Sequence, residues 1–224
     1  LRRGLLEHAA ARLGVPAGRL AMAGGRVQLD GEPRMSLAEL MAGEPDKDIG
    51  PPPAEAEHRF ELDHMTYSHG VTVAEVEVDV LTGAVRPRQV WIACDVGRVI
   101  NPRMVAGQIE GGAAQGVGGA LLEAFQYDEE GQLLTGSFQE YLLPTSWEVP
   151  PIAFELLEDT PSTLNPLGVK GVGEIGVAGM GGALANAVAA AVGDPQRPAT
   201  ALPLTPESVW RRLDEQRANQ RVTA

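Results

Sequence analysis

The chain has 224 residues, of which 44% are hydrophobic and 21% charged, and its formal net charge is −12. This composition is typical of a globular protein with a buried core and excludes a wholly disordered chain. The excess of acid argues against nucleic acid or an anionic membrane as a partner, and no apolar run reaches the length of a membrane-spanning helix.

Cys94 is the only cysteine, so no internal disulfide can form, which favours a reducing compartment and a cytoplasmic location. The chain opens on Leu1-Arg2-Arg3, without a signal-peptide pattern. We therefore expect the C-terminal part of something longer, or a processed or split subunit.

The N-terminal quarter predicts a small segment, residues 1–50, that continues an upstream domain. Apolar spacing predicts an amphipathic helix at 2–13, which Gly14 ends. Gly24-Gly25 predicts a hairpin between strands at 20–23 and 26–29. Ser36 and Glu39 form a capping box that opens a short helix, and the acidic, proline-rich stretch 43–57 predicts a surface linker.

A β-rich section follows, within a second domain that we expect at residues 58–213. Residues 71–80 alternate apolar and polar side chains, and Thr82-Gly83 turns this strand into an antiparallel partner at 85–93. Asn101-Pro102 starts a helix at about 103–125 that contains six glycines. Because each glycine costs about 1 kcal/mol in a helix, they imply a close backbone approach to a neighbouring element or ligand.

The remaining elements complete an α+β fold with mixed or antiparallel sheets and packed Gly/Ala-rich helices. We expect a turn at Glu130-Gly131 within 127–134, strands at 138–142 and 152–158, and a helix at 181–192. Thr205-Pro206-Glu207 starts a last helix, followed by a polar tail at 214–224.

The stretch from Asn165 to Gly176, here called the glutamate loop, places one carboxylate, Glu174, among four glycines. Glycines let backbone approach a ligand closely, and the free N–H groups of the following helix could face an anion. A merely solvated acid is the simple alternative, but it does not require glycine on both sides. A carboxylate in a tight apolar loop can serve as a general base.

Residues 171–176 also match G-x-G-x-x-G, the dinucleotide-binding pattern, with Asp194 about twenty residues further on. The context contradicts that interpretation. The approach to the loop contains Asn165-Pro166 and Gly168 rather than a buried strand, and no second strand precedes Asp194.

The glutamate loop resembles that of the molybdenum hydroxylases, the family of xanthine dehydrogenase, aldehyde oxidase and aerobic carbon monoxide dehydrogenase large subunits. Further blocks match in the same order, and together they span most of residues 1–213. These blocks are residues 74–79, 94–102, 107–112, 115–116, 140–145 and 201–207. Such a resemblance implies the C-terminal molybdopterin-binding portion of a heteromeric hydroxylase.

The resemblance also implies site roles. Glu174 matches the base that deprotonates a molybdenum-bound hydroxyl, whose water-derived oxygen attacks an electron-poor carbon of an N-heterocycle, an aldehyde or CO. Gln108 matches a glutamine that hydrogen-bonds the cofactor, although by itself it reads as an exposed helix residue. Lys170, Gly171, Val172 and Gly173 would line the cofactor, either molybdopterin or its cytosine dinucleotide form.

Other chemically active residues carry weaker expectations. Cys94 reads as a buried small residue, and Asp95 and Arg98 as residues that fix a turn by local hydrogen bonds. No metal-site spacing fits the histidines. Glu110 lies within the Gly-rich helix near Gln108, where a buried position is possible, and the sequence assigns it no role. The histidines considered are His58, His64 and His69.

The resemblance implies partners as well. Relatives' large subunits are several times longer, so an upstream molybdopterin chain would complete the site, and iron–sulfur and FAD subunits would carry the electrons away. This chain has no cysteine cluster for an iron–sulfur centre. A non-catalytic fragment that acts as an interaction module is the alternative.

Overall fold

The computed structural model describes residues 1–42, 49–53, 55–57, 59–61 and 64–223, without the side chains of 219–223. The expected linker at 43–57 lies partly outside these residues, and His58 lies wholly outside them. The chain divides into two compact units, Leu1–Glu61 and Leu62–Ala224. No helix in the described part is long and apolar enough to cross a membrane.

The first unit is a three-stranded antiparallel sheet with two helices, and it confirms the predicted helix, hairpin and capping box. Glu39 N donates to Ser36 Oγ (3.1 Å) while Ser36 N donates to the Glu39 carboxylate (2.6 Å). The strand at Glu32–Ser36 escaped prediction because Pro33 interrupts it. The elements are α1 (Arg2–Leu13), η1 (Ala17–Arg19), β1 (Leu20–Ala23), β2 (Arg26–Leu29), β3 (Glu32–Ser36) and α2 (Leu37–Ala42).

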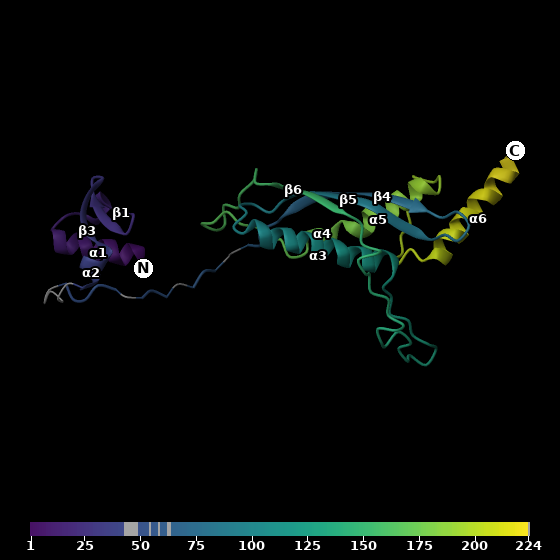
Figure 1. Ribbon diagram of the computed structural model, residues 1–224, viewed down its shortest axis with the longest axis horizontal. Helices are drawn as coiled ribbons and strands as arrows, with labels where there is room; N and C mark the ends of the chain where they lie inside the picture. Colours follow the sequence, from purple (N-terminus) through teal and green to yellow (C-terminus); the bar gives the residue numbers. More distant parts are fainter. Residues whose placement is uncertain (43–48, 54, 58, 62–63, 224) are drawn as a thin grey trace. The chain divides into compact units, whose positions relative to one another are not determined.

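The second unit is built on a three-stranded sheet, β4–β5–β6, as Figure 1 shows. β4 pairs antiparallel with β5 as predicted, whereas β5 pairs parallel with β6, with α3 in the crossover between them. The elements are β4 (His69–Val78), β5 (Val85–Asp95), α3 (Pro102–Leu121), β6 (Ile152–Leu157), α4 (Ile175–Ala178), α5 (Met180–Ala191) and α6 (Pro206–Thr223).

Residues 122–150, here called the arm, connect α3 to β6 without forming a helix or a strand. The predicted turn at Glu130-Gly131 is present, with Gly131 at φ 83° and one isolated bridge between Tyr127 and Leu133. The predicted strand at 138–142 is wrong: Ser137 O accepts from Tyr141 N at 2.8 Å, which closes a turn there.

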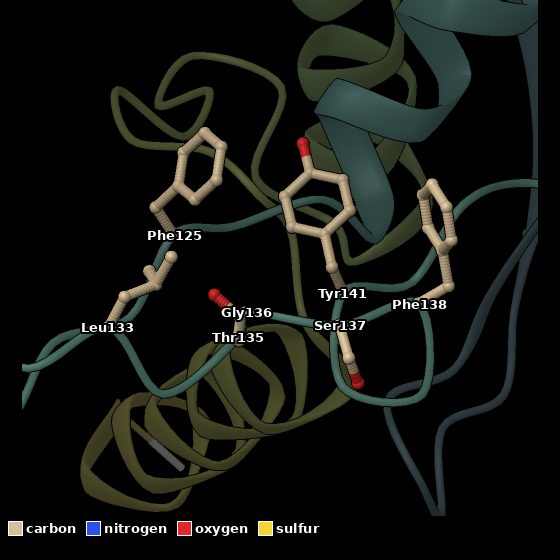
Figure 2. A pocket seen from close by; sticks show the side chains of 7 residues that line it. All are labelled: Phe125, Leu133, Thr135, Gly136, Ser137, Phe138 and Tyr141. Atoms are coloured by element: carbon tan, nitrogen blue, oxygen red, sulfur yellow. The ribbon is translucent and has the colours of Figure 1, made fainter.

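The arm exposes large apolar side chains, Phe138 and Trp147 among them at 85% and 74% exposure. It contains a surface pocket of about 370 Å³ in which the Phe125 and Tyr141 rings lie side by side, 5.1 Å apart between centroids (Figure 2). Tyr141 donates to Glu123 Oε2 (2.7 Å), and this hydrogen bond raises the pKa of the phenol. Apolar and hydroxyl groups therefore line this pocket, away from the predicted site.

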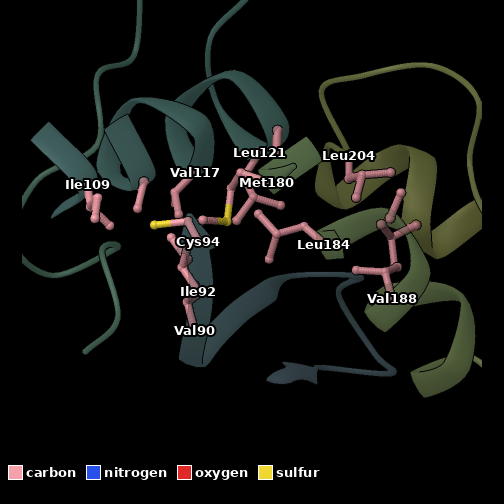
Figure 3. Close-up of a cluster of buried hydrophobic side chains, with 14 of the residues drawn as sticks. Val90, Ile92, Cys94, Ile109, Val117, Leu121, Met180, Leu184, Val188 and Leu204 are labelled. Atoms are coloured by element: carbon pink, nitrogen blue, oxygen red, sulfur yellow. The ribbon is translucent and has the colours of Figure 1, made fainter. Parts of the chain in front are cut away.

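The core lies on the helix-covered side of the sheet. Val90, Ile92 and Cys94 of β5 point toward α3 and α5, where Val117 and Met180 meet them (Figure 3). On β4, burial alternates along the strand, so Val71 and Val73 lie on the opposite face and are exposed. Helices thus cover only one face of the sheet.

Close glycine packing joins α3 to α4, as the glycine content predicted. A Cβ on Gly112 would lie 3.1 Å from Gly176 Cα, and one on Gly116 would lie 2.5 Å from Met180 Cβ. Gly118 likewise lies against Glu123 and Pro144. The other three glycines of α3 approach no neighbouring element among the described residues, so for them the ligand alternative stays a prediction: Gly107, Gly111 and Gly119.

Several element ends differ from the sequence prediction. α3 begins as expected, with the Asn101 side chain accepting from Met104 N (3.2 Å), but it ends at Leu121 because the chain turns into the arm. A short extra helix, α4, separates the glutamate loop from α5, so the α5 N-terminus does not follow Glu174 directly. At the C-terminus, α6 continues through the expected polar tail to Thr223.

Replacing Gly176 by alanine tests the glycine packing. The added Cβ would overlap Ile109 O and lie 2.9 Å from Ala113 N, so we expect a loss of about 1–3 kcal/mol in unfolding free energy, typical of overpacking. Gly119→Ala, in open space on the same helix pair, should instead gain about 0.4–1 kcal/mol. Chemical denaturation of both variants measures the contrast, and equal effects would contradict the packing argument.

Candidate functional site

The first half of the glutamate loop runs against the end of β5. An isolated bridge joins Gly97 to Val169, and Lys170 N donates to Val96 O at 2.9 Å. Gly97 has φ 66° and Gly168 has φ 71°, a conformation that suits glycine, and a Cβ on Gly97 would overlap Gly168 O. The loop therefore sits as close to β5 as backbone permits.

Asn165 stabilises the same segment from within. Its side chain donates to Val169 O (2.9 Å) and accepts from Val169 N (3.1 Å). A reciprocal pair of this kind fixes the turn before Lys170. The Asn165-Pro166 stretch that argued against a dinucleotide site thus has a structural role.

Glu174 occupies the N-cap position of α4, but its side chain makes no capping hydrogen bond and is exposed. It borders an open pocket of about 400 Å³ together with Ser68, Gly171, Gly173, Ile175 and Ala178. Among the described residues, the N–H groups of Gly171, Val172 and Gly173 donate to no protein acceptor. A carboxylate and two residues with unbonded backbone donors, Gly171 and Gly173, therefore border the same opening.

Gln108 lies beside this loop, although 66 residues separate it from Glu174 in the sequence. Its side chain is exposed on α3, and a Cβ built on Gly173 would lie 3.7 Å from Gln108 Nε2. The buried neighbours Ile109 and Ala113 hold this face of α3 against α4. The structure thus brings together Gln108 and the loop that contains Glu174.

Lys170 is placed differently from the other predicted cofactor contacts. Its ammonium donates to Asp95 Oδ1 (3.2 Å) and Thr160 Oγ1 (2.6 Å), and its side chain is only 9% exposed. Both the ammonium and the backbone N–H of Lys170 are thus engaged within the protein.

Asp95 is the buried centre of a polar group, here called the Asp95 cluster, made of Asp95, Thr160 and Lys170, in which Thr160 is exposed. It accepts from Gly97 N (2.8 Å) at one oxygen, and from Thr160 N and Oγ1 (both 2.9 Å) at the other. Burial by itself raises the pKa of the Asp95 carboxyl, but hydrogen bonds from Gly97, Thr160 and Lys170 outweigh burial and hold the pKa well below its usual range.

Sequence reasoning only partly anticipated this cluster. The expected local hydrogen bond of Asp95, to the turn at Gly97, is present, but its longer-range partners were missed. Arg98 contributes its backbone N–H, which donates to Gly168 O (2.9 Å). Thr160 and Ser68 gave no signal in the sequence, because single hydroxyl residues carry no spacing pattern.

The remaining candidates lie outside the site. Cys94 is buried as expected, and burial raises the pKa of its thiol. His64 and His69 are exposed, and Glu110 is exposed as well, since it lies on the outer face of α3. Within the described ranges, no group of three or more His, Cys, Asp or Glu side chains could hold a metal ion.

Comparison with known proteins points to one family. The family model for the molybdopterin cofactor-binding domain matches residues 1–150. Subunit gamma of the 6-hydroxypseudooxynicotine dehydrogenase complex of Paenarthrobacter nicotinovorans is 45% identical over 148 residues, which are 66% of this chain and 18% of that protein. The nicotine 6-hydroxylase large subunit of the same organism is 38% identical over 185 residues, which are 80% and 22% of the two chains.

A solved structure agrees. The chain superposes on reconstituted CO dehydrogenase from Oligotropha carboxidovorans with a TM-score of 0.83 and 27% identity, covering 96% of this chain and 27% of that one. The chain thus spans about a fifth of the two curated relatives, at 22% and 18% of their lengths.

Acid titration tests the Asp95 cluster. Because the folded-state pKa of Asp95 is lowered, its stabilising contribution is complete above the unfolded-state pKa of about 3.9 and is lost as the pH falls below that value. We therefore expect Asp95→Asn to be less stable than the parent at pH 6, with the gap narrowing between pH 4 and pH 2. Unfolding free energies across that range measure the gap, and a constant gap would contradict the cluster.

Proposed function

The chain belongs to the molybdopterin cofactor-binding family of the molybdenum hydroxylases, and from this premise we propose that it is the C-terminal molybdopterin-binding portion, or a split subunit, of such an enzyme. The observation that carries the proposal is that Gln108 lies beside the loop that contains Glu174: its Nε2 is 3.7 Å from a Cβ built on Gly173, and Gly173 borders the same open pocket as Glu174. The reaction proposed is oxidative hydroxylation of an electron-poor carbon, with water as the oxygen source.

The residues at this opening fit a large, oxygen-rich cofactor. The N–H groups of Gly171, Val172 and Gly173 can donate to its oxygens, and the glycines leave room for backbone to approach it. Val172 packs its side chain against the core, so the loop has a fixed inner side. The Gln108 amide can donate without adding charge.

The chemistry divides between the cofactor and this chain. When bound, the molybdenum cofactor supplies the two-electron oxidation of the substrate carbon. Glu174 acts as general base: its carboxylate accepts the proton from the attacking oxygen. Gln108 orients the cofactor by a hydrogen bond, and Lys170 belongs to the cofactor-lining part of the loop as the residue directly before Gly171.

The relatives' names support a substrate class. Those of the two curated relatives refer to nicotine and to 6-hydroxypseudooxynicotine, so we propose a pyridine-type N-heterocycle rather than CO or a simple aldehyde. Both relatives are described as subunits. We propose that an upstream molybdopterin chain completes the site and that iron–sulfur and FAD subunits carry the electrons, with the cofactor in its cytosine dinucleotide form.

Metal and pterin analysis of the purified native complex tests whether the complex contains the molybdenum cofactor that the proposed function requires. We expect about one molybdenum and one pterin for each copy of this chain. Hydroxylation of a pyridine substrate in ¹⁸O-labelled water should place the label in the product. A complex without molybdenum and pterin would support the interaction-module alternative instead.

Replacing Glu174 by glutamine tests the base. The exposed carboxylate makes no capping bond, so folding and molybdenum content should stay unchanged, while kcat falls by about 10²–10⁴-fold, the usual cost of losing a general base. Glu155→Gln, the same change at an exposed position of β6, is the matched control and should keep full activity. Full turnover in Glu174→Gln would refute the assignment.

A further inference from the structure

We propose that Asp95 and Lys170 are positioning residues whose ion pair fixes the glutamate loop, and with it Glu174, relative to α3. This inference rests on the proposed function, because it concerns how the proposed base is held. It assigns the Lys170 ammonium to the protein's own loop and not to direct contact with the cofactor.

The part of the glutamate loop that contains Glu174, residues 171–175, is held at both ends. At its start, the Lys170 side chain bonds Asp95 and Thr160, and its backbone bonds Val96. At its end, Gly176 packs against Ile109 and Ala113 of α3 so closely that no Cβ fits. Only the five residues 171–175 lie between these two contacts, and Glu174 is one of them.

The two ends differ in what holds them. Close packing against α3 holds Gly176, whereas Lys170 is held by its backbone hydrogen bond to Val96 and by a charge pair whose side chains are 9% and 2% exposed. Water is largely excluded from such a pair, so the attraction between the two charges is screened little. The hydrogen bond within the pair also fixes the orientation of the Lys170 side chain. Asp95 also accepts from Gly97 N in the turn that leads to α3. The same carboxylate therefore bonds both the segment that leads to Gln108 and the segment that leads to Glu174.

The use of lysine at this position is itself unusual in the chain. Of 18 basic residues, only Lys47 and Lys170 are lysines. The compact ammonium donates to the buried Asp95 and to Thr160 at once, whereas the broad guanidinium of arginine would need more room beside Asp95. Because the chain has so few lysines, the reaction of Lys170 with an amine-selective reagent can be followed with little interference from other side chains.

The experiment compares three variants of the complete complex: Lys170→Met, Asp95→Asn, and the two changes combined. Lys170→Met leaves a buried carboxylate without its cation, so its thermal midpoint should drop sharply. The double variant removes both charges and should regain much of that midpoint. Its kcat should nevertheless stay about 10–100-fold low, the cost of a displaced reacting group, with KM and molybdenum content near the parent values.

Amine labelling supplies a readout that does not depend on turnover. Lys170 should react slowly with acetic anhydride in the parent complex, and about tenfold faster in Asp95→Asn, because local opening becomes easier once its partner charge is lost. Peptide mass spectrometry follows Lys170 itself. The control is Glu207→Gln, which breaks an exposed pair with Arg211, both side chains about 70% exposed, and should change neither labelling nor kcat.

Two results would overturn the proposal. If the double variant recovers kcat together with its thermal midpoint, or fails to fold at all, the pair serves the fold alone. Equal labelling of Lys170 in the parent and in Asp95→Asn would show that the pair does not hold the loop. A complex that lacks molybdenum would instead refute the proposed function. The difference in Lys170 labelling between the parent and Asp95→Asn would still show whether the pair holds the loop.

Discussion

The contact between Gly112 and Gly176 sets the geometry on which the rest of the site depends. Backbone touches backbone there, so the separation of α3 from α4 cannot shrink further and has no side chain to adjust it. Gln108 lies one helical turn before Gly112, and Glu174 lies two residues before Gly176. Both proposed functional side chains therefore lie within four residues of one rigid contact.

Charge complements this packing at the other side of the loop. Asp95 gathers hydrogen bonds from three segments of the chain that meet at the end of β5. A buried carboxylate is stable only when its oxygens are satisfied, so the segments that satisfy it are held in register with one another. Packing sets how far the loop stands from α3, and the Asp95 cluster sets where along the sheet it stands.

The parts of the fold that sequence reasoning reached were those fixed by local chemistry. The Ser36–Glu39 capping box, the Asn101 cap and the Gly24-Gly25 hairpin each act within a few residues, so their patterns are visible in the chain. The strand expected at 138–142 failed because its apolar residues Phe138 and Leu142 lie exposed in and beside a turn. No local pattern indicates the parallel β5–β6 pairing.

The same distinction holds in the site. Glu174 and Gln108 stood out through their glycine-rich surroundings and family blocks, whereas the partnership of Asp95 with Lys170 spans 75 residues. From the sequence, Asp95 had a plausible local explanation as a turn residue, and Lys170 was expected to line the cofactor. Only the fold, which brings the end of β5 against the glutamate loop, shows that each serves the other.

The contacts of Lys170 with Asp95 and of Gly176 with α3 have a consequence for which positions can be substituted. These positions tolerate little change, because a methyl group at Gly176 or an unpaired charge at Asp95 would disturb everything nearby. Ser68 and Ala178, on the rim of the pocket, carry no such burden. Substitutions at Ser68 and Ala178 would therefore change the wall of the pocket while leaving the contacts that hold Glu174 in place.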